Sequence, residues 1–331
     1  MTHLFNKMII DTVLSKIPPY ISPINYLASA LNLSKESIYR RIRDEVPFTL
    51  QDIYILATDL SISLDEIIHS SKEKNLNSKL SLFEYRSNSI FDPEQLFFEI
   101  FSMYDNSLAN LVYKETEVII AVNHLMIFST IHLDHLFRFY YYKWVQQFHL
   151  MPLKFRLSDI EIPEKISILR DNIKSNGVFV GNNIYILDQN FIKNTLLEVQ
   201  YYYKRKLISD EELLLIQQDF SSFVDMLEGM VKEKIKSPNF NSQIYIPSFR
   251  IESSGLYARY GDQEECHFWI YSGTHIASKD REVCKTYKAW LVSFKKYSSL
   301  ITGCNEPLQT AFLDQQRSYV DNIKNKNFSY E

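Results

Sequence analysis

The chain has 331 residues, 46% of them hydrophobic and 23% charged, with a formal net charge of -4. This composition is typical of a globular protein of two or three domains, and it excludes a disordered or fibrous chain. The acidic balance excludes a protein that coats nucleic acid along its whole surface, but it permits one local basic face. Only seven residues are glycine, which disfavours nucleotide-using enzymes because their phosphate-binding loops need glycine.

Neither a secretory signal nor a membrane span is expected. Asp11 and Lys16 interrupt the apolar character of the N-terminal stretch, and no small-residue cleavage site follows. The most apolar run, residues 118–130, is too short to cross a bilayer and contains Asn123 and His124. We therefore expect a cytoplasmic protein.

Two domains of different character are predicted. Four or five short helical patterns fill residues 1–70. Residues 71–79 are polar, with little to bury, and are predicted to be a linker. Residues 80–331 are richer in aromatic residues, and we expect them to form a larger α+β domain with a small antiparallel sheet.

The elements of this second region follow from local patterns. An antiparallel meander is predicted over 243–271, where β-branched and aromatic runs are broken near Gly255 and Gly261. A hairpin is predicted over 178–187, turning at Gly181–Asn183. The predicted helices cover 92–104, 131–148, 190–206, 210–236, 280–297 and 306–326.

One of these helices, 210–236, has a predicted capping box at Ser209 and Glu212. It also carries an apolar stripe with steps of three and four residues, formed by Leu213, Ile216, Phe220, Phe223, Leu227 and Met230. The stripe favours packing within its own domain, and a dimer contact is the alternative.

In the N-terminal region, the stretch NYLASALNLSKESIYRRIR at 25–43 contains two helical patterns with a very short spacer. Ser22 followed by Pro23 is typical of a helix start. The first helix is predicted over 23–31, and its apolar face consists of Ile24, Leu27, Ala28 and Leu31.

Asn32 tolerates left-handed backbone angles, so it can end the first helix where glycine would usually stand. Leu33 then fills the corner, and Ser34 can cap a second helix that runs to about Arg43. Two helices joined by such a tight turn make a helix-turn-helix.

The outward face of the second helix carries basic and hydroxyl side chains, while Ile38 and Ile42 face inward. Arginine can pair with guanine, and hydroxyl groups at a helix N-terminus can approach phosphates or base edges. The candidate DNA-binding residues on this helix are Ser34, Lys35, Glu36, Ser37, Tyr39, Arg40 and Arg43.

The segment LASALNLSKESIYRRI resembles the helix-turn-helix of the lambda-repressor-like, or Cro/XRE-type, family of DNA-binding domains. The stretch 47–68 is also similar to that family's two closing helices, with Thr49 as a cap and a capping box at 63–66. The resemblance covers residues 3–69. Asn32 replaces the family's usual turn glycine, and Arg41 stands where an aliphatic residue is common.

The resemblance implies contacts with double-stranded DNA. The residues that would probe the major groove are Lys35, Glu36, Tyr39 and Arg40. Thr49 and Gln51, at the next helix start, would contact the backbone. One recognition helix reads only a few base pairs, so we expect a homodimer on a palindromic operator. Residues 80–331 are expected to form the dimer contact and to bind a small-molecule or peptide effector if there is one.

We therefore expect a transcription regulator without enzymatic activity or a cofactor. Two alternatives stay open: an interaction module whose head no longer binds DNA, and an enzyme with a DNA-binding head. The arginines near residue 43 would be favoured at a helix C-terminus whatever the function. Tyr39 could also be a surface-packed residue, and Glu36 could pair with Arg40.

Other conspicuous residues have ordinary interpretations. His132 and His135 lie on adjacent helical turns, but no second ligand pair is evident, so no metal site is predicted. The three cysteines lack a CxxC pair, which favours reduced thiols. The aromatic clusters at 128–148 and 199–203 favour core packing over a ligand pocket.

Overall fold

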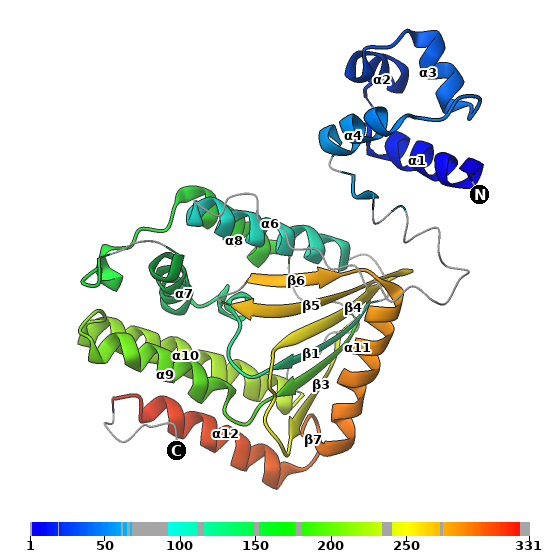
Figure 1. The fold of residues 1–331 in the computed structure, drawn as a ribbon. Coiled ribbons are helices and arrows are strands. Elements are labelled where there is room, and N and C mark those ends of the chain that lie inside the picture. The colour runs from blue at the N-terminus through cyan, green and yellow to red at the C-terminus, as the bar shows by residue number, and fades with distance from the viewer. Residues whose placement is uncertain are drawn as a thin grey trace. The chain divides into compact units, whose positions relative to one another are not determined.

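The computed structural model describes residues 2–18, 20–60, 62–64, 67, 92–111, 116–148, 152–176, 181–233, 240–271 and 274–324. The chain divides into two compact units, Met1–Leu82 and Phe83–Glu331 (Figure 1). We call them the N-terminal unit and the C-terminal unit. The predicted linker at 71–79 lies outside the described residues.

The described part of the N-terminal unit is helical, as expected. Its helices are α1 (Thr2–Lys16), α2 (Pro23–Leu31), α3 (Lys35–Ile42) and α4 (Leu50–Asp59). Their apolar faces share one core, in which Leu27, Ile38 and Leu56 are each at most 1% exposed. The predicted capping box at 63–66 lies partly outside the described residues.

The C-terminal unit is built on a mixed sheet that contains seven strands among the described residues. The strands are β1 (Thr116–Val122), β2 (Gly181–Leu187), β3 (Phe240–Pro247), β4 (Gly255–Tyr260), β5 (Gln263–Tyr271), β6 (Thr274–Ser278) and β7 (Ser298–Leu300). Their order is β6-β5-β4-β1-β2-β3-β7. The neighbours β1, β2 and β3 are parallel, and the strands outside them are antiparallel.

This sheet corrects three predictions. The α+β class is right, but the sheet is neither small nor purely antiparallel. The hairpin at 178–187 is wrong, because Gly181–Asn183 are part of β2, where Asn182 pairs with Glu117 of β1. The meander is right for β4 and β5, whereas β3 pairs with β2 and β7 instead.

The parallel part of the sheet was not predicted because of the character of β1. Six of its seven residues are buried, because helices cover both faces of the sheet there. A strand buried on both faces lacks the alternation of apolar and polar residues that marks a strand in the sequence.

Helices lie on both faces of the sheet. They are α6 (Pro93–Leu111), α7 (Asp134–Phe148), α8 (Glu164–Asn176), α9 (Phe191–Lys204), α10 (Asp210–Val231), α11 (Arg281–Phe294) and α12 (Glu306–Asp321). Short 3-10 helices span Ile127–Thr130, Leu157–Asp159 and Lys295–Tyr297. No described helix has both the length and the apolar character that crossing a bilayer requires.

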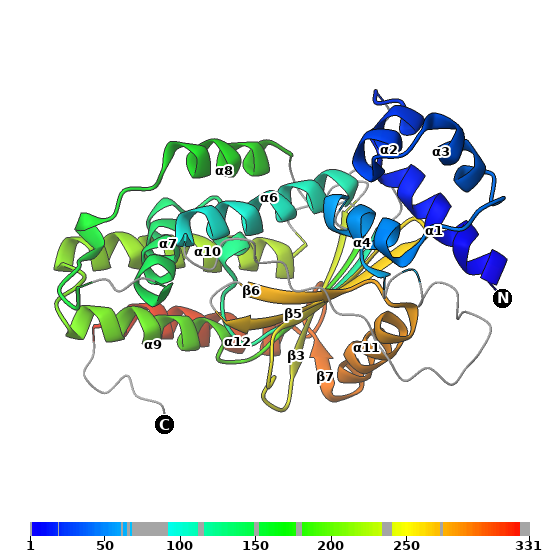
Figure 2. The same cartoon turned by 45° about the horizontal axis from the view of Figure 1, so that its top comes forward.

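Neighbouring residues of β1 point to opposite faces, as the two-residue period of a strand requires. Ile119 packs with Leu291 of α11 in one core, and Ile120 belongs to a second, larger core formed with the other helices. Figure 2 shows α11 on one side of the strands and α9, α10 and α12 on the other. Of the α-helices in the described part of the C-terminal unit, only α8 lacks a counterpart in the prediction.

The apolar stripe of α10 packs within its own unit, which confirms the first of the two interpretations. Leu213 and Phe220 are fully buried, and Met230 packs at the edge of the same core. The capping box is also present, since Glu212 N–H donates to Ser209 Oγ over 3.2 Å and Ser209 N–H donates to the Glu212 carboxylate over 2.8 Å.

The aromatic cluster of α7 is likewise mainly core. Phe137, Phe139 and Tyr142 have no exposed surface. Phe97 of α6 meets Tyr141 edge to face, with 4.9 Å between ring centroids. Aromatic burial of this kind contributes a large share of the stability of the unit.

Candidate DNA-binding surface

The turn between α2 and α3 depends on Asn32, whose backbone is left-handed with φ 52° and ψ 46°. The N–H of Leu33 donates to Ala28 O over 3.1 Å, and the N–H of Asn32 donates to Ser29 O over 3.4 Å. This pair of bonds is the Schellman motif, which closes a helix around a left-handed residue. The next helix then starts at once, because Ser34 Oγ accepts the N–H of Ser37 over 3.2 Å.

The left-handed angle gives a prediction at Asn32. Asn32→Ala should destabilise the N-terminal unit by about 1 kcal/mol, since a Cβ-bearing residue without a short polar side chain disfavours this conformation. Asn32→Gly should leave stability unchanged or raise it by a few tenths of a kcal/mol. Hydrogen exchange of the α2 and α3 amides in the intact chain would measure both. Equal protection in the two variants would contradict the prediction.

The helix α3 has a buried side and an exposed side. Ile38 is fully buried, and Ile42 is half-buried against the same core. At 100° per residue, the outward positions span an arc of about 140°. The exposed residues on this arc are Lys35, Glu36, Tyr39, Arg40 and Arg43. We call these five residues the α3 outer face.

Arg41 lies apart from the α3 outer face and faces inward. Its Nε donates to Asp52 Oδ2 over 3.2 Å, and the two side chains are only 13% and 12% exposed. Asp52 also accepts the N–H of Thr49 over 2.9 Å and donates its own N–H to Thr49 Oγ1 over 3.1 Å. Arg41 therefore connects α3 to the N-terminal cap of α4.

Thr49 and Gln51 are both exposed at the start of α4. The oxygen of the Thr49 hydroxyl accepts the capping bond, so its proton can still be donated to a phosphate oxygen. Ser34 has the same dual capacity at the start of α3, and Ser37 is half-buried one turn later. The structure thus places all nine predicted residues on or beside α3 and at the start of α4.

Asn6 of α1 is a positioning residue that the sequence analysis missed. It is 6% exposed, and its side-chain amide donates to the Asp44 carboxylate, while its Oδ1 accepts the N–H of Phe48 over 3.2 Å. Asp44 has a left-handed backbone with φ 59°. Asn6 therefore holds the turn that leads from α3 to α4. No local signal marks such a residue, because its partners lie about forty positions further along the chain.

A further side-chain hydrogen bond connects α2 to α4. The Tyr26 hydroxyl donates to the Asp59 carboxylate. Burial, and then this hydrogen bond, raise the pKa of Tyr26 to about 12. The hydroxyl therefore stays protonated at neutral pH and keeps its role as a donor.

Glu45 also belongs to this surface, although the sequence analysis did not include it. Its carboxylate lies 3.8 Å from Arg40 Nε and 4.0 Å from a guanidinium nitrogen of Arg43. All three side chains are about half exposed or more, and such surface pairs contribute at most about 1 kcal/mol. The guanidinium of Arg43 also lies 6.0 Å from the ring centroid of Tyr39. Glu45 therefore lowers the positive potential of the α3 outer face without neutralising it.

This arrangement gives a prediction at Glu45. Glu45→Gln should raise the affinity for DNA several-fold at low salt, because it removes the carboxylate that competes with phosphates for Arg40 and Arg43. The gain should shrink as salt rises. Anisotropy titrations with a labelled duplex at two salt concentrations would measure it, and an affinity equal to that of the wild type at both would contradict it.

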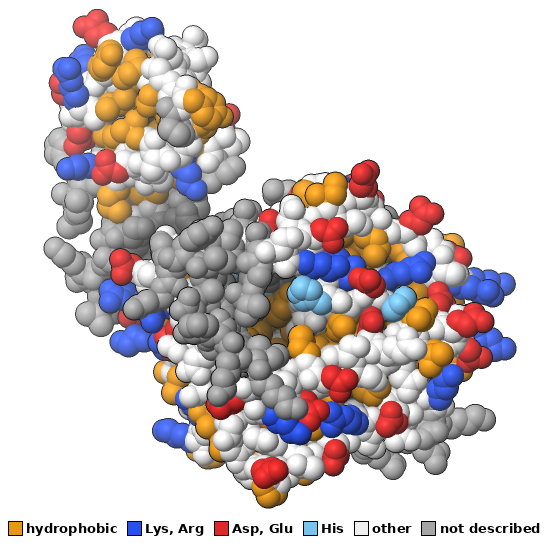
Figure 3. Space-filling model, turned by 180° about the vertical axis from the view of Figure 1, so that it is seen from behind, with side chains coloured by type: hydrophobic (Ala, Val, Ile, Leu, Met, Phe, Trp, Pro, Cys, Tyr) orange, Lys and Arg blue, Asp and Glu red, His pale blue; other side chains and the backbone are white. Residues whose placement is uncertain are grey.

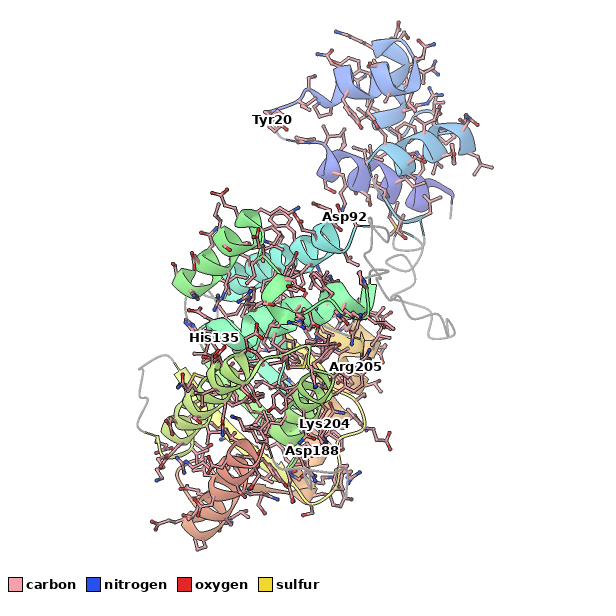
Figure 4. The ribbon with its side chains drawn as sticks, turned by 90° about the vertical axis from the view of Figure 1, so that its left-hand side faces the viewer. Tyr20, Asp92, His135, Asp188, Lys204 and Arg205 are labelled. Carbon is pink, nitrogen blue, oxygen red and sulfur yellow. The ribbon has the colours of Figure 1, made fainter. Side chains whose placement is uncertain are left out.

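The other cationic and histidine clusters lie in the C-terminal unit. Figure 4 shows His135 at the start of α7 and Lys204 and Arg205 at the end of α9. The backbone N–H of His135 donates to Asp219 Oδ2 over 2.7 Å. Within the described ranges, no group of three or more His, Cys, Asp or Glu side chains could hold a metal ion. The face of the C-terminal unit seen in Figure 3 mixes basic and acidic side chains rather than presenting one sign of charge.

The three cysteines are free thiols, in agreement with the prediction. Cys266 of β5 and Cys284 of α11 are fully buried in the core beneath α11.

Comparison with family models, with curated proteins and with solved structures finds no match for this chain. The likeness to the Cro/XRE-type family stays a prediction from the sequence.

Proposed function

We propose that the N-terminal unit binds double-stranded DNA and that the chain is a sequence-specific transcription regulator of the cytoplasm. The observation that carries the proposal is the α3 outer face, a row of exposed cationic and hydrogen-bonding side chains on a helix whose other side is fixed in the core. A helix set at a tight turn in this way can enter the major groove and present its first residues to base edges.

Within this proposal the side chains divide by chemistry. Lys35 and Arg40 donate to guanine edges or to phosphates, and Glu36 discriminates among bases by accepting from cytosine or by repelling other edges. The hydroxyls of Ser34 and Ser37 and the side chains of Thr49 and Gln51 contact the phosphate backbone, as donors at helix N-termini commonly do. These contacts fix the register of α3 in the groove.

We also propose that the protein acts as a homodimer on a palindromic operator. A dimer places two recognition helices about one DNA turn, or 34 Å, apart. The stripe of α10 is buried in its own core, so the dimer contact uses a different surface of the C-terminal unit. Sedimentation equilibrium of the full chain would test this. We assign the chain no catalytic role.

Selection of genomic fragments tests the proposed function most directly. Fragments of the source genome retained by the full chain at low salt should share a palindromic element. The logarithm of their affinity should fall linearly with the logarithm of the salt concentration, because counterions are released from the phosphates that the protein contacts. A folded dimer that retains no fragment at any salt concentration would favour the interaction-module alternative.

A further inference from the structure

A polar pocket of about 300 Å³ lies at the carboxyl end of β1. It is lined by the residues that follow this strand and by side chains of α7 and α9. Its polar lining residues are Asn123, His124, Lys143, Gln147, Asn194 and Glu198, together with the hydroxyl-bearing Tyr140. Open sheets with parallel strands commonly bind ligands in crevices outside the carboxyl ends of those strands. Its volume stands at the lower end of the range for small-molecule sites, so it suits a small ligand.

Asn123 fixes the rim of the pocket. Its side-chain nitrogen donates to Ile251 O and Glu252 O, each over 3.1 Å. Its Oδ1 accepts the hydroxyl of Ser254 over 2.9 Å and lies 2.7 Å from His124 Nδ1. Because this oxygen can only accept, His124 Nδ1 must carry a proton, and in the neutral ring Nε2 is left as an acceptor.

The imidazole is neutral near physiological pH. Burial lowers the pKa of His124; the Glu198 carboxylate opposes this shift, and the Lys143 ammonium adds to it. His124 therefore lines the pocket with an uncharged ring rather than with a cation.

Lys143 and Glu198 supply the two charges of the pocket. Lys143 Nζ lies 2.6 Å from Glu198 Oε2, with 8% of the lysine side chain and 41% of the glutamate side chain exposed. The ammonium also lies 5.1 Å from the ring centroid of Tyr140. An ammonium group has three N–H donors and a carboxylate accepts several bonds, so each partner keeps hydrogen-bonding capacity beyond the pair.

The charge pattern selects the class of ligand. A lone anion would meet the partly exposed Glu198, and a lone cation would meet Lys143. A molecule with both charges can satisfy both groups, since each end pairs with one member of the ion pair. The walls formed by Met126, Ile127 and Tyr140 offer an apolar surface beside these charges.

We propose that this pocket binds a small zwitterion of amino-acid size, whose ammonium group donates to Glu198 and His124 and whose carboxylate accepts from Lys143. The side-chain nitrogen of Asn194 already donates to Asn123 O over 2.6 Å, and its second N–H is a further donor for the carboxylate. Such a ligand would be bound and not chemically altered, at a site separate from the α3 outer face.

Calorimetric titration of the full chain with each of the twenty standard amino acids tests it. At least one of them should bind. For that amino acid, the methyl ester, which lacks the carboxylate charge, and the N-acetyl derivative, which lacks the ammonium, should each bind at least tenfold more weakly. These derivatives test the charge pattern on the unaltered protein, so the result does not depend on whether a variant folds.

A variant pair then tests the location. Glu198→Gln should weaken binding at least tenfold, whereas Glu161→Gln, an exposed position outside the pocket with the same change of charge, should not. Absence of heat from all twenty amino acids at millimolar concentration would overturn the proposal. Binding of either derivative as tight as that of the amino acid, unchanged binding by Glu198→Gln, or binding of glucose but of no amino acid would also overturn it. The titration contains no DNA, so its outcome is independent of the fragment selection.

Discussion

Replacing Lys35 and Arg40 together by alanine should abolish recognition of a selected operator fragment while leaving the fold intact. Both side chains are exposed, and the Arg40 pair with Glu45 spans 3.8 Å at the surface, so its loss costs the free protein little. A side chain that contacts a base edge contributes about 1–3 kcal/mol, so the double variant should bind about 100-fold more weakly or worse. Fluorescence anisotropy over a salt series would measure both the affinity and the salt slope.

The matched control removes the same charge elsewhere. Lys204→Ala combined with Arg205→Ala also changes the formal net charge by two, from -4 to -6, at the exposed end of α9. This control should keep both the affinity and the slope of the wild type. If the two double variants lost affinity equally, the effect would be one of overall charge, and the role of the α3 outer face would be contradicted.

The second large effect is expected in the C-terminal unit. Phe220→Ala removes a ring that is fully buried in the α10 stripe. Truncating a buried phenylalanine lowers the free energy of unfolding by about 3–5 kcal/mol. The hydrophobic free energy of burying the ring is lost, and a cavity forms in its place. The chain's three tryptophans, Trp144, Trp269 and Trp290, all belong to this unit, so urea unfolding followed by tryptophan fluorescence reports on it selectively.

Leu214→Ala provides the control on the same helix. Leu214 is 49% exposed, so its truncation should change stability by about 0.5 kcal/mol or less. Sedimentation of both variants would show whether the stripe also contributes to a dimer contact. If Phe220→Ala left the unfolding midpoint unchanged but shifted the protein toward monomers, the stripe would be a dimer contact and its packing as described would be contradicted.

The predictions that succeeded concern features encoded by a few consecutive residues. The capping box at Ser209 and the cap at Ser34 are present, because side chain and backbone within one helical turn satisfy each other. The left-handed Asn32 belongs to the same class. The boundaries of α9 and α11 also fall within a few residues of the predicted ones.

The predictions that failed concern pairing between distant segments. In the parallel core, Glu117 of β1 pairs with Asn182 of β2, although the α-helices α7 and α8 lie between these strands in the chain. Parallel strands need such long crossovers, and their pairing register leaves no trace in a short window of sequence. The stretch at Gly181–Asn183 therefore has the local chemistry of a turn but lies in a strand.

For the candidate DNA-binding surface, the sequence by itself determined the bend at Asn32 and the polarity of α3. Backbone preference at one residue and helical periodicity over two turns suffice for both. Tertiary structure decided that Arg41 turns inward to Asp52 and that Glu45 approaches Arg40. It also decided that Lys143 and Glu198, 55 positions apart, meet in one pocket beside His124, because that contact exists only once α7 and α9 pack on the same face of the sheet.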